Sequence, residues 1–82
     1  MELKKGQIVK SVKGHDKGDL LMIADFDEKR VLLSDGKHRK LNKPKSKNIK
    51  HIELTGFEVD LKAVDTDRKL RKTLNKIANP GG

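Results

Sequence analysis

The sequence predicts a mainly β domain, in which a small five-stranded antiparallel barrel is followed by a C-terminal α-helix. Three observations predict this fold class. Apolar runs of strand length recur from Gln7 to Leu54, and glycine-containing or polar turns separate them. Apolar residues at helical spacing begin only after Asp65. The length of 82 residues allows one small domain.

The chain is strongly basic, with 20 Lys and Arg against 12 Asp and Glu and a net charge of +8. An excess of this size favours an anionic partner: nucleic acid first, an anionic membrane second and an acidic protein third. No run reaches the roughly 18 apolar residues of a membrane-spanning helix. The chain has no cysteine, and the apolar stretch of a signal peptide is not seen at Met1–Gly6. We therefore expect a cytoplasmic protein that is not inserted in a membrane.

The first two strands are expected at Gln7–Val12 and Asp19–Phe26. Ile8 and Val9 are adjacent and would point to opposite faces of a strand, which either a strand covered on both sides or a strand wrapping a small barrel explains. The uncharged run Leu20–Ala24 in the second strand indicates the same two-sided burial.

A compact turn, Gly14-His15-Asp16-Lys17-Gly18, joins these two strands. Glycine tolerates positive φ and permits close backbone approach, so both glycines suit a tight loop. With Lys13, His15 and Lys17 around it, the loop can present positive side chains together with backbone N–H groups. A plain strand connection without a ligand explains the turn equally well when it is considered alone.

The third strand is expected at Arg30–Ser34. The Asp35-Gly36 pair that follows favours a type I′ hairpin turn, which requires positive φ at both residues. The next strand is then Lys37–Leu41, basic enough to lie at an edge. A basic loop, Asn42–Asn48, leads to a last strand at Ile49–Leu54.

The composition changes after a boundary at Thr55–Gly56, which separates the barrel (1–55) from a connecting segment (56–64). Phe57, Val59 and Leu61 alternate and are expected to pack on the barrel. A helix is expected over 65–78, with Asp65 or Thr66 as its N-cap, and a flexible tail over 79–82. Its apolar face comprises Leu70, Leu74, Ile77 and Ala78, and the opposite arc comprises Arg68, Lys69, Arg71, Lys72 and Lys76.

The tract from Lys37 to His51 contains nine basic or histidine side chains and no Asp or Glu. They are Lys37, His38, Arg39, Lys40, Lys43, Lys45, Lys47, Lys50 and His51. A solvated loop is the plain alternative, but soluble surfaces usually mix both signs of charge, so this tract indicates an anionic partner. Lysines would bind phosphates as point charges, and Arg39 suits a bidentate or stacking contact. We expect Gln at Lys43, Lys45 and Lys47 to weaken RNA binding without changing thermal stability.

Other chemistries find little support in the residues. His15, His38 and His51 lack metal-ligand spacing, and no nucleophile–base set or phosphate-binding loop is present, so we expect no metal, no cofactor and no enzymatic activity. Phe26 and Phe57 lie in apolar settings, and we expect both to pack in the core. Stacking of bases on aromatic side chains is therefore not expected.

The segment Gly6–Gly18 (GQIVKSVKGHDKG) resembles the start of a KOW motif, in which a glycine between two strands is followed by a Lys-Gly pair. Together with Val31–Leu41 and Lys43–His51, it is similar to bacterial RNA-binding KOW proteins related to the large-subunit ribosomal protein numbered fourteen in archaea and eukaryotes. The resemblance covers about residues 6–55 and implies an SH3-like barrel that binds RNA. It places Gly14 at the motif glycine and makes Lys13–Gly18 the contact loop. Leu20 and Leu21 stand where many KOW motifs have another glycine.

The charge pattern predicts a protein that binds structured RNA through phosphate contacts. The resemblance implies that ribosomal RNA is the target and that the role is associated with the ribosome or with translation. The expected contact residues are Lys13, Gly14, His15, Lys17, Gly18, Lys37, His38, Arg39, Lys40, Lys43, Lys45, Lys47, Lys50, Arg68, Arg71 and Lys72. Ribosomal proteins are further possible partners, and the free protein is expected to be a monomer. The competing hypothesis is a protein-interaction module whose basic surface docks an acidic partner.

Overall fold

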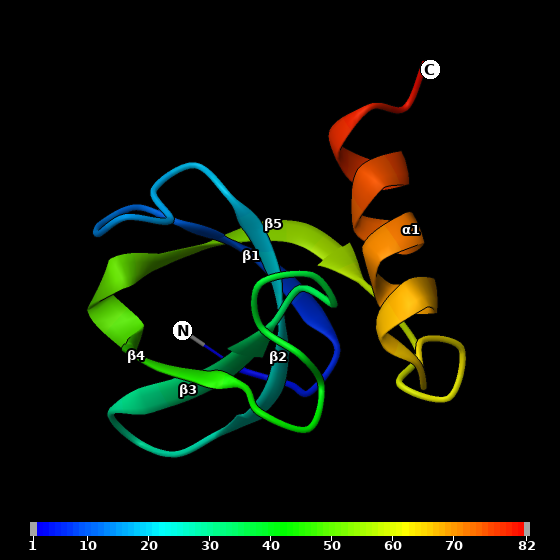
Figure 1. The fold of residues 1–82 in the computed structure, drawn as a ribbon. Helices are drawn as coiled ribbons and strands as arrows, with labels where there is room; N and C mark the ends of the chain where they lie inside the picture. Colours follow the sequence, from blue (N-terminus) through cyan, green and yellow to red (C-terminus); the bar gives the residue numbers. More distant parts are fainter. Residues whose placement is uncertain (1, 82) are drawn as a thin grey trace.

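The computed structural model describes residues 2–81 and contains one five-stranded antiparallel sheet with one α-helix (Figure 1). The strands are β1 (Gln7–Ser11), β2 (Leu20–Phe26), β3 (Arg30–Ser34), β4 (Lys45–Asn48) and β5 (Ile52–Glu58), in the sheet order β4-β3-β2-β1-β5. The 3-10 helix η1 (Ile49–His51) links the two edge strands, β4 and β5, so the sheet curls into a small barrel. The predicted fold class is confirmed.

Strands β1 and β2 are covered on both faces, which the run Leu20–Ala24 predicted for β2 and which is one of the two explanations for the adjacent Ile8 and Val9. Inside the barrel, the buried core consists of Val9, Leu21, Ile23, Val31, Leu33 and Ile52. On the outer face, Ile8 and Met22 are opposite each other in the β1–β2 ladder and pack against the C-terminal part of the chain. Because side chains alternate along a strand, one ladder supplies two separate apolar layers.

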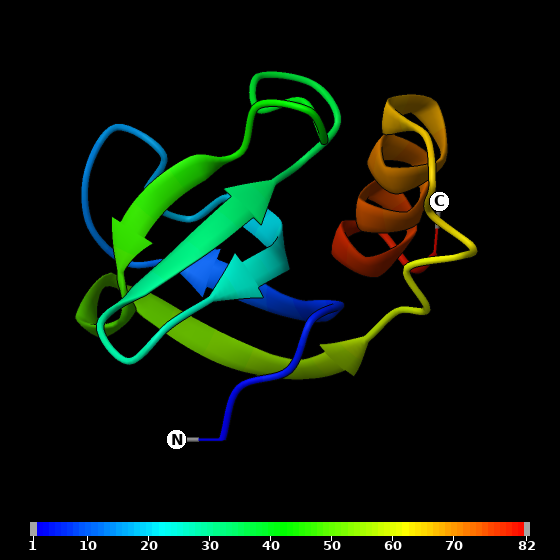
Figure 2. The same ribbon diagram turned by 90° about the horizontal axis from the view of Figure 1, so that it is seen from below.

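Helix α1 (Asp67–Ala78) covers the outer face of the sheet through Leu70 and Leu74 (Figure 2). The side chain of Thr66 accepts a hydrogen bond from the Lys69 backbone N–H at 3.2 Å, which makes Thr66 the N-cap, one of the two residues expected there. Ala78 is exposed, although it belonged to the predicted apolar face. No helix within residues 2–81 is both long enough and apolar enough to cross a membrane.

The expected strand at Lys37–Leu41 is wrong, because β4 instead begins at Lys45. The Asp35 side chain accepts hydrogen bonds from the backbone N–H groups of Lys37 and Arg39, each at 2.8 Å, and thereby turns the chain away from the sheet. Asp35 does not have the positive φ that a type I′ turn requires. The basic loop 35–44 therefore replaces the predicted two-residue turn, and β3 pairs antiparallel with β4 across this longer connection.

The last strand also differs from expectation, since β5 runs through the predicted boundary at Thr55–Gly56 and ends at Glu58. Val9 pairs with Leu54 and Gln7 with Glu58, so three residues of β5 lie opposite Ile8 in a bulge.

The predicted burial of Phe57, Leu61 and Phe26 is wrong. Phe57 lies in the β5 bulge and is 53% exposed, and Leu61 is 38% exposed. Val59, in contrast, packs against the apolar cluster on the outer face of the sheet, which includes Ile8 and Met22. Phe26 lies at the end of β2, beyond a shift in its register with β3, and is 37% exposed. Both phenylalanines are therefore surface residues.

Candidate nucleic-acid interface

The turn between β1 and β2 is fastened to β4 by a buried lysine. Lys47 Nζ donates hydrogen bonds to Ser11 Oγ at 2.9 Å, to the Lys13 carbonyl at 2.7 Å and to Asp16 Oδ1 at 2.6 Å. Ser11 Oγ in turn donates to Asp16 Oδ1 at 2.8 Å. All three donors of the ammonium group are therefore used inside the protein.

Asp16 is the charged partner in this network. Burial by itself would raise the pKa of its carboxyl, but hydrogen bonds from Lys47 and Ser11 and the positive charges of Lys47 and Lys45 outweigh that effect and lower the pKa to about 2. The Asp16 carboxylate thus stays ionised throughout the physiological range and holds the turn in place.

The expectation that Lys47 is an exposed, phosphate-binding lysine is wrong, because its ammonium group is buried and fully hydrogen-bonded. For the same reason, the expectation that Gln at Lys47 leaves thermal stability unchanged is wrong. The Lys47 side chain is 7% exposed and points inward. Lys45 also forms an ion pair within the protein, since its Nζ lies 3.5 Å from Asp16 Oδ2. Side chains alternate along β4, and Lys47 pairs with the buried Val31 in β3, so Lys47 shares the inward side with its neighbour.

Loop 35–44 presents the exposed part of the basic tract. Its exposed side chains are Lys37, His38, Arg39, Lys40 and Lys43. The loop is fixed at its start by the Asp35 hydrogen bonds and at its end by Leu41, whose backbone N–H donates to Asp67 Oδ1 at 2.7 Å. These basic side chains therefore extend from a loop whose backbone is held at both ends.

Gly36 brings this loop against the first turns of α1. It is buried with φ of +77°, and a Cβ atom at this position would lie 2.2 Å from the Asp67 carbonyl oxygen and 3.1 Å from the Arg71 backbone nitrogen. Only glycine allows this approach. The exposed basic side chains of the helix therefore lie on the same surface as those of the loop. We call this surface the loop–helix face; its Lys and Arg members are Lys37, Arg39, Lys40, Lys43, Arg68, Arg71 and Lys72.

Two clefts connect the glycine turn to this face. The first is lined by His15, Asp16, Asp19, Leu21, Asp35, His38, Arg39 and Lys45. The second is lined by Gly18, Asp19, Leu20, Asp35, Lys37, His38, Arg71, Leu74, Asn75 and Ala78. Because Asp19, Asp35 and His38 line both, the clefts adjoin and the turn, the loop and the helix meet there.

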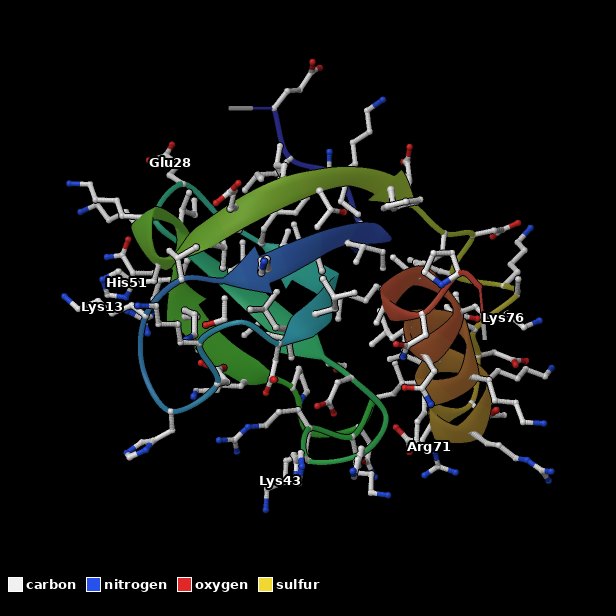
Figure 3. The ribbon with its side chains drawn as sticks, turned by 90° about the horizontal axis from the view of Figure 1, so that it is seen from above. Lys13, Glu28, Lys43, His51, Arg71 and Lys76 are labelled. Atoms are coloured by element: carbon white, nitrogen blue, oxygen red, sulfur yellow. The ribbon has the colours of Figure 1, made fainter. Side chains whose placement is uncertain are left out.

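The remaining predicted contacts lie elsewhere. The Val12 N–H donates to the His51 carbonyl at 3.0 Å, and Lys13 and His51 lie side by side, away from Lys43 and Arg71 (Figure 3). Lys50 belongs to η1 beside His51 and is exposed.

Within the glycine turn, Lys17 lines a groove over β1 and β5 together with Lys10 and Glu53. Gly14 and Gly18 both have positive φ, as expected for a tight loop. The backbone N–H groups of Lys17 and Gly18 donate to carbonyls of Gly14 and Ser11, so they are used within the turn.

The Lys and Arg side chains of the loop–helix face form no ion pair with a carboxylate of the described chain, although Asp19 and Asp35 line the clefts beside them. Within residues 2–81, the basic partners in ion pairs are Lys5, Lys45, Lys47 and Lys69. None of the seven exposed Lys and Arg side chains of the face takes part in one; they are Lys37, Arg39, Lys40, Lys43, Arg68, Arg71 and Lys72. This surface has the electrostatic character of a site for anions.

Sequence reasoning missed the acidic and neutral members of the site. Asp19 and Asn75 line the second cleft, but each belongs to a segment whose sequence pattern indicated only a strand or a helix. Among residues 2–81, no cluster of three or more His, Asp or Glu side chains is arranged to hold a metal ion. Neither the family models nor the curated proteins compared with this chain match it.

Proposed function

We propose that this chain is an RNA-binding protein of the KOW type that contacts structured RNA through phosphate groups. The observation that carries the proposal is the loop–helix face, where seven exposed and unpaired Lys and Arg side chains extend from two elements locked together at Gly36. Phosphate contacts dominate the affinity of nucleic-acid binding, and they depend on Lys and Arg side chains that have no ion-pair partner within the protein.

The rigidity of the face supports binding over mere solvation. A solvated loop needs no fixed backbone, whereas loop 35–44 is held by Asp35 at one end and by the Leu41–Asp67 hydrogen bond at the other. Basic side chains that extend from a fixed backbone lose less conformational entropy when they bind a rigid partner. Since phosphate contacts position a protein without reading bases, the overall preference would come from RNA shape.

The KOW resemblance makes ribosomal RNA the favoured target. The proposed role is therefore associated with the ribosome or with translation, in the cytoplasm, with neighbouring ribosomal proteins as secondary partners. In this role the free protein is a monomer that needs neither a cofactor nor a catalytic step. The Gly14 turn is part of the proposed contact surface through His15, which lines the first cleft.

Salt titration of binding to a ribosomal RNA fragment tests the proposal. With about six phosphates engaged, the logarithm of the binding constant should fall against the logarithm of salt concentration with a slope near −4 to −5. The variant with Gln at Lys37, Arg39, Lys40 and Lys43 should lose about three units of that slope. A matched control with Gln at the exposed Lys4, Lys10, Lys29 and Lys62 removes the same charge from other surfaces.

The two variants separate a defined site from general attraction. The control should retain most of the slope and affinity. Equal losses in both variants would assign the binding to net charge alone. An absence of RNA binding at low salt would contradict the proposal and favour the alternative, in which the same surface docks an acidic protein.

A further inference from the structure

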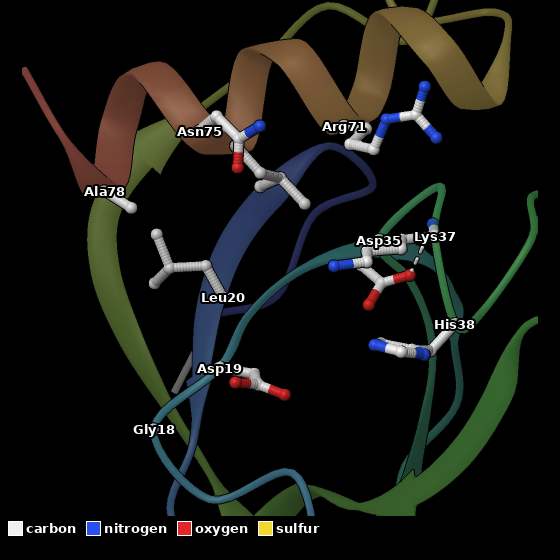
Figure 4. A pocket seen from close by; sticks show the side chains of 10 residues that line it. Gly18, Asp19, Leu20, Asp35, Lys37, His38, Arg71, Asn75 and Ala78 are labelled. Carbon is white, nitrogen blue, oxygen red and sulfur yellow. Dashed lines mark hydrogen bonds between the residues drawn. The ribbon is translucent and has the colours of Figure 1, made fainter. Parts of the chain in front are cut away.

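We infer that the second cleft receives one unpaired guanine of the bound RNA. This inference rests on the proposed function and adds base recognition to it. The cleft lies between the glycine turn, loop 35–44 and α1, and its volume is about 280 Å³ (Figure 4). That size is at the lower end of small-molecule sites, which suits a single base rather than a helix.

The polar side chains of the cleft have opposite charges that do not neutralise each other. Figure 4 shows the polar ends of Lys37, Asp35, His38 and Asp19 directed toward the cavity. Lys37 and Asp19 make no side-chain hydrogen bond or ion pair within residues 2–81. An ammonium donor and a carboxylate acceptor therefore face the same space, each available to a ligand.

Guanine matches this pair of groups. Its O6 and N7 atoms are acceptors that a lysine ammonium recognises, which fits Lys37. Lys37 then contacts the base, and the other six Lys and Arg side chains of the loop–helix face contact phosphates. The N1–H and N2–H groups of guanine are two adjacent donors, and an ionised carboxylate accepts two parallel hydrogen bonds, which fits Asp19. The other bases do not present two neighbouring donors of this kind, so the carboxylate distinguishes guanine from them.

Asp35 has a different role because one of its oxygens is already used. Its Oδ1 accepts the N–H groups of Lys37 and Arg39, whereas no hydrogen bond to Oδ2 is formed within the described chain. Oδ2 can accept one further donor, such as a ribose hydroxyl, and the 2′-hydroxyl is present only in RNA.

The rest of the lining suits the flat, apolar faces of a base. Leu20 of β2 and Leu74 and Ala78 of α1 supply the apolar wall. The His38 ring is a planar group of the type on which unstacked RNA bases lie. Arg71 lies at the helix side, where the loop–helix face would bind the flanking phosphates.

The base must be unpaired to enter. Its Watson–Crick edge, which Asp19 would bind, is occupied in a duplex, and the deep major groove of A-form RNA is closed to side chains. A loop or bulge leaves this edge unpaired, so the base can enter the cleft without opening a duplex.

Binding of a set of RNA hairpins tests the inference. All share one stem and carry a single bulged G, A, C or U, and a fully paired hairpin completes the set. We expect the bulged-G hairpin to bind about tenfold more tightly than the others, because one bidentate base contact gives discrimination of this order. The salt slope should be the same for all, since it counts phosphates.

Two isosteric variants assign the effect to Asp19. Asp19→Asn replaces one carboxylate oxygen by an amide and should abolish the preference for G. Glu28→Gln makes the same charge change at an exposed position far from the cleft and should keep the preference (Figure 3). Retention of the preference in Asp19→Asn would overturn the inference.

The remaining outcomes separate this inference from the proposed function. Equal, salt-dependent binding of all hairpins would overturn the guanine site and leave RNA binding intact. No binding of any hairpin at low salt would overturn both. The last measurement is the binding of guanosine monophosphate alone. If it binds as tightly as the bulged-G hairpin, the cleft is a site for a free nucleotide. Much weaker binding supports a site for an RNA base.

Discussion

Loop 35–44 and strand β4 are consecutive parts of one basic tract, yet their lysines have opposite environments. Lys43 is exposed and has no ion-pair partner within the described residues. Lys47, four residues later, is buried and gives all its donors to Ser11, Asp16 and the Lys13 carbonyl. The same type of side chain is therefore exposed to solvent at position 43 and buried in a hydrogen-bond network at position 47.

The difference shows that a charge tract divides according to backbone geometry. In loop 35–44, the Asp35 hydrogen bonds and the buried Gly36 direct the chain along α1, so the bases point outward. In β4, alternation places every second side chain inside the barrel. A lysine there is tolerated only because Asp16 is close enough to neutralise it.

The largest expected effect is on stability, from Lys47→Gln. Removing the ammonium leaves the Asp16 carboxylate without its main partner, and loss of one member of a buried pair costs about 3 kcal/mol of the free energy of unfolding. Urea denaturation measures this change. The matched variant Lys43→Gln should stay within about 0.5 kcal/mol of the original protein. Equal stability of both variants would contradict the contrast between the two lysines.

The docking of the loop on α1 is tested next by Gly36→Ala. The new Cβ would collide with the Asp67 carbonyl oxygen at positive φ, and we expect a loss of about 2–3 kcal/mol in the free energy of unfolding. Gly18→Ala is the control, since its φ of +93° is equally unfavourable but nothing lies within 4 Å of the added atom. A loss in Gly18→Ala as large as that in Gly36→Ala would show that φ alone matters.

The Lys47 network should also appear in the pH dependence of stability. The folded-state pKa of Asp16, about 2, is below the ordinary value of 3.8, so its contribution is present above pH 4 and is lost as pH falls from about 4 to about 2. The lost free energy is on the order of 2 kcal/mol. Urea denaturation at several pH values measures it. In Asp16→Asn, this acid-dependent step should be absent; an unchanged step would assign it to other carboxyls.

The smallest expected effect concerns RNA affinity in Lys43→Gln. One phosphate contact fewer should lower the salt slope by about 0.7–0.9 and leave the free energy of unfolding unchanged within about 0.5 kcal/mol. Fluorescence anisotropy with a labelled RNA fragment measures the slope. An unchanged slope would place Lys43 outside the interface and confine the contact to the rest of the loop–helix face.

Most elements were predictable from local patterns. The uncharged run Leu20–Ala24 correctly indicated two covered faces, and Thr66 and the spacing of Leu70 and Leu74 correctly indicated the helix. The failures fell where distant segments compete with local preference. Asp35-Gly36 favours a two-residue turn locally, but the Asp35 side chain bonds the Lys37 and Arg39 N–H groups, and Gly36 packs against the distant helix α1 in a longer loop.

The candidate site was predictable only in part. The bases of loop 35–44 and the exposed helix arc were identified from charge pattern, because charge is visible in the chain itself. Their union into one face, the cleft lined by Asp19 and Asn75, and the burial of Lys47 were not. Each depends on residues more than 25 positions apart, such as Leu41 with Asp67 or Lys47 with Asp16.

The sequence by itself determined the strand-forming runs, the helix with its cap and the excess of positive charge, because these depend on residue type and short-range spacing. Only the tertiary structure decided which lysines face solvent and which neighbour each acquires. The physical reason is that burial of an ammonium is unfavourable unless a carboxylate from a distant segment meets it, and that meeting is set by the packing of the whole barrel.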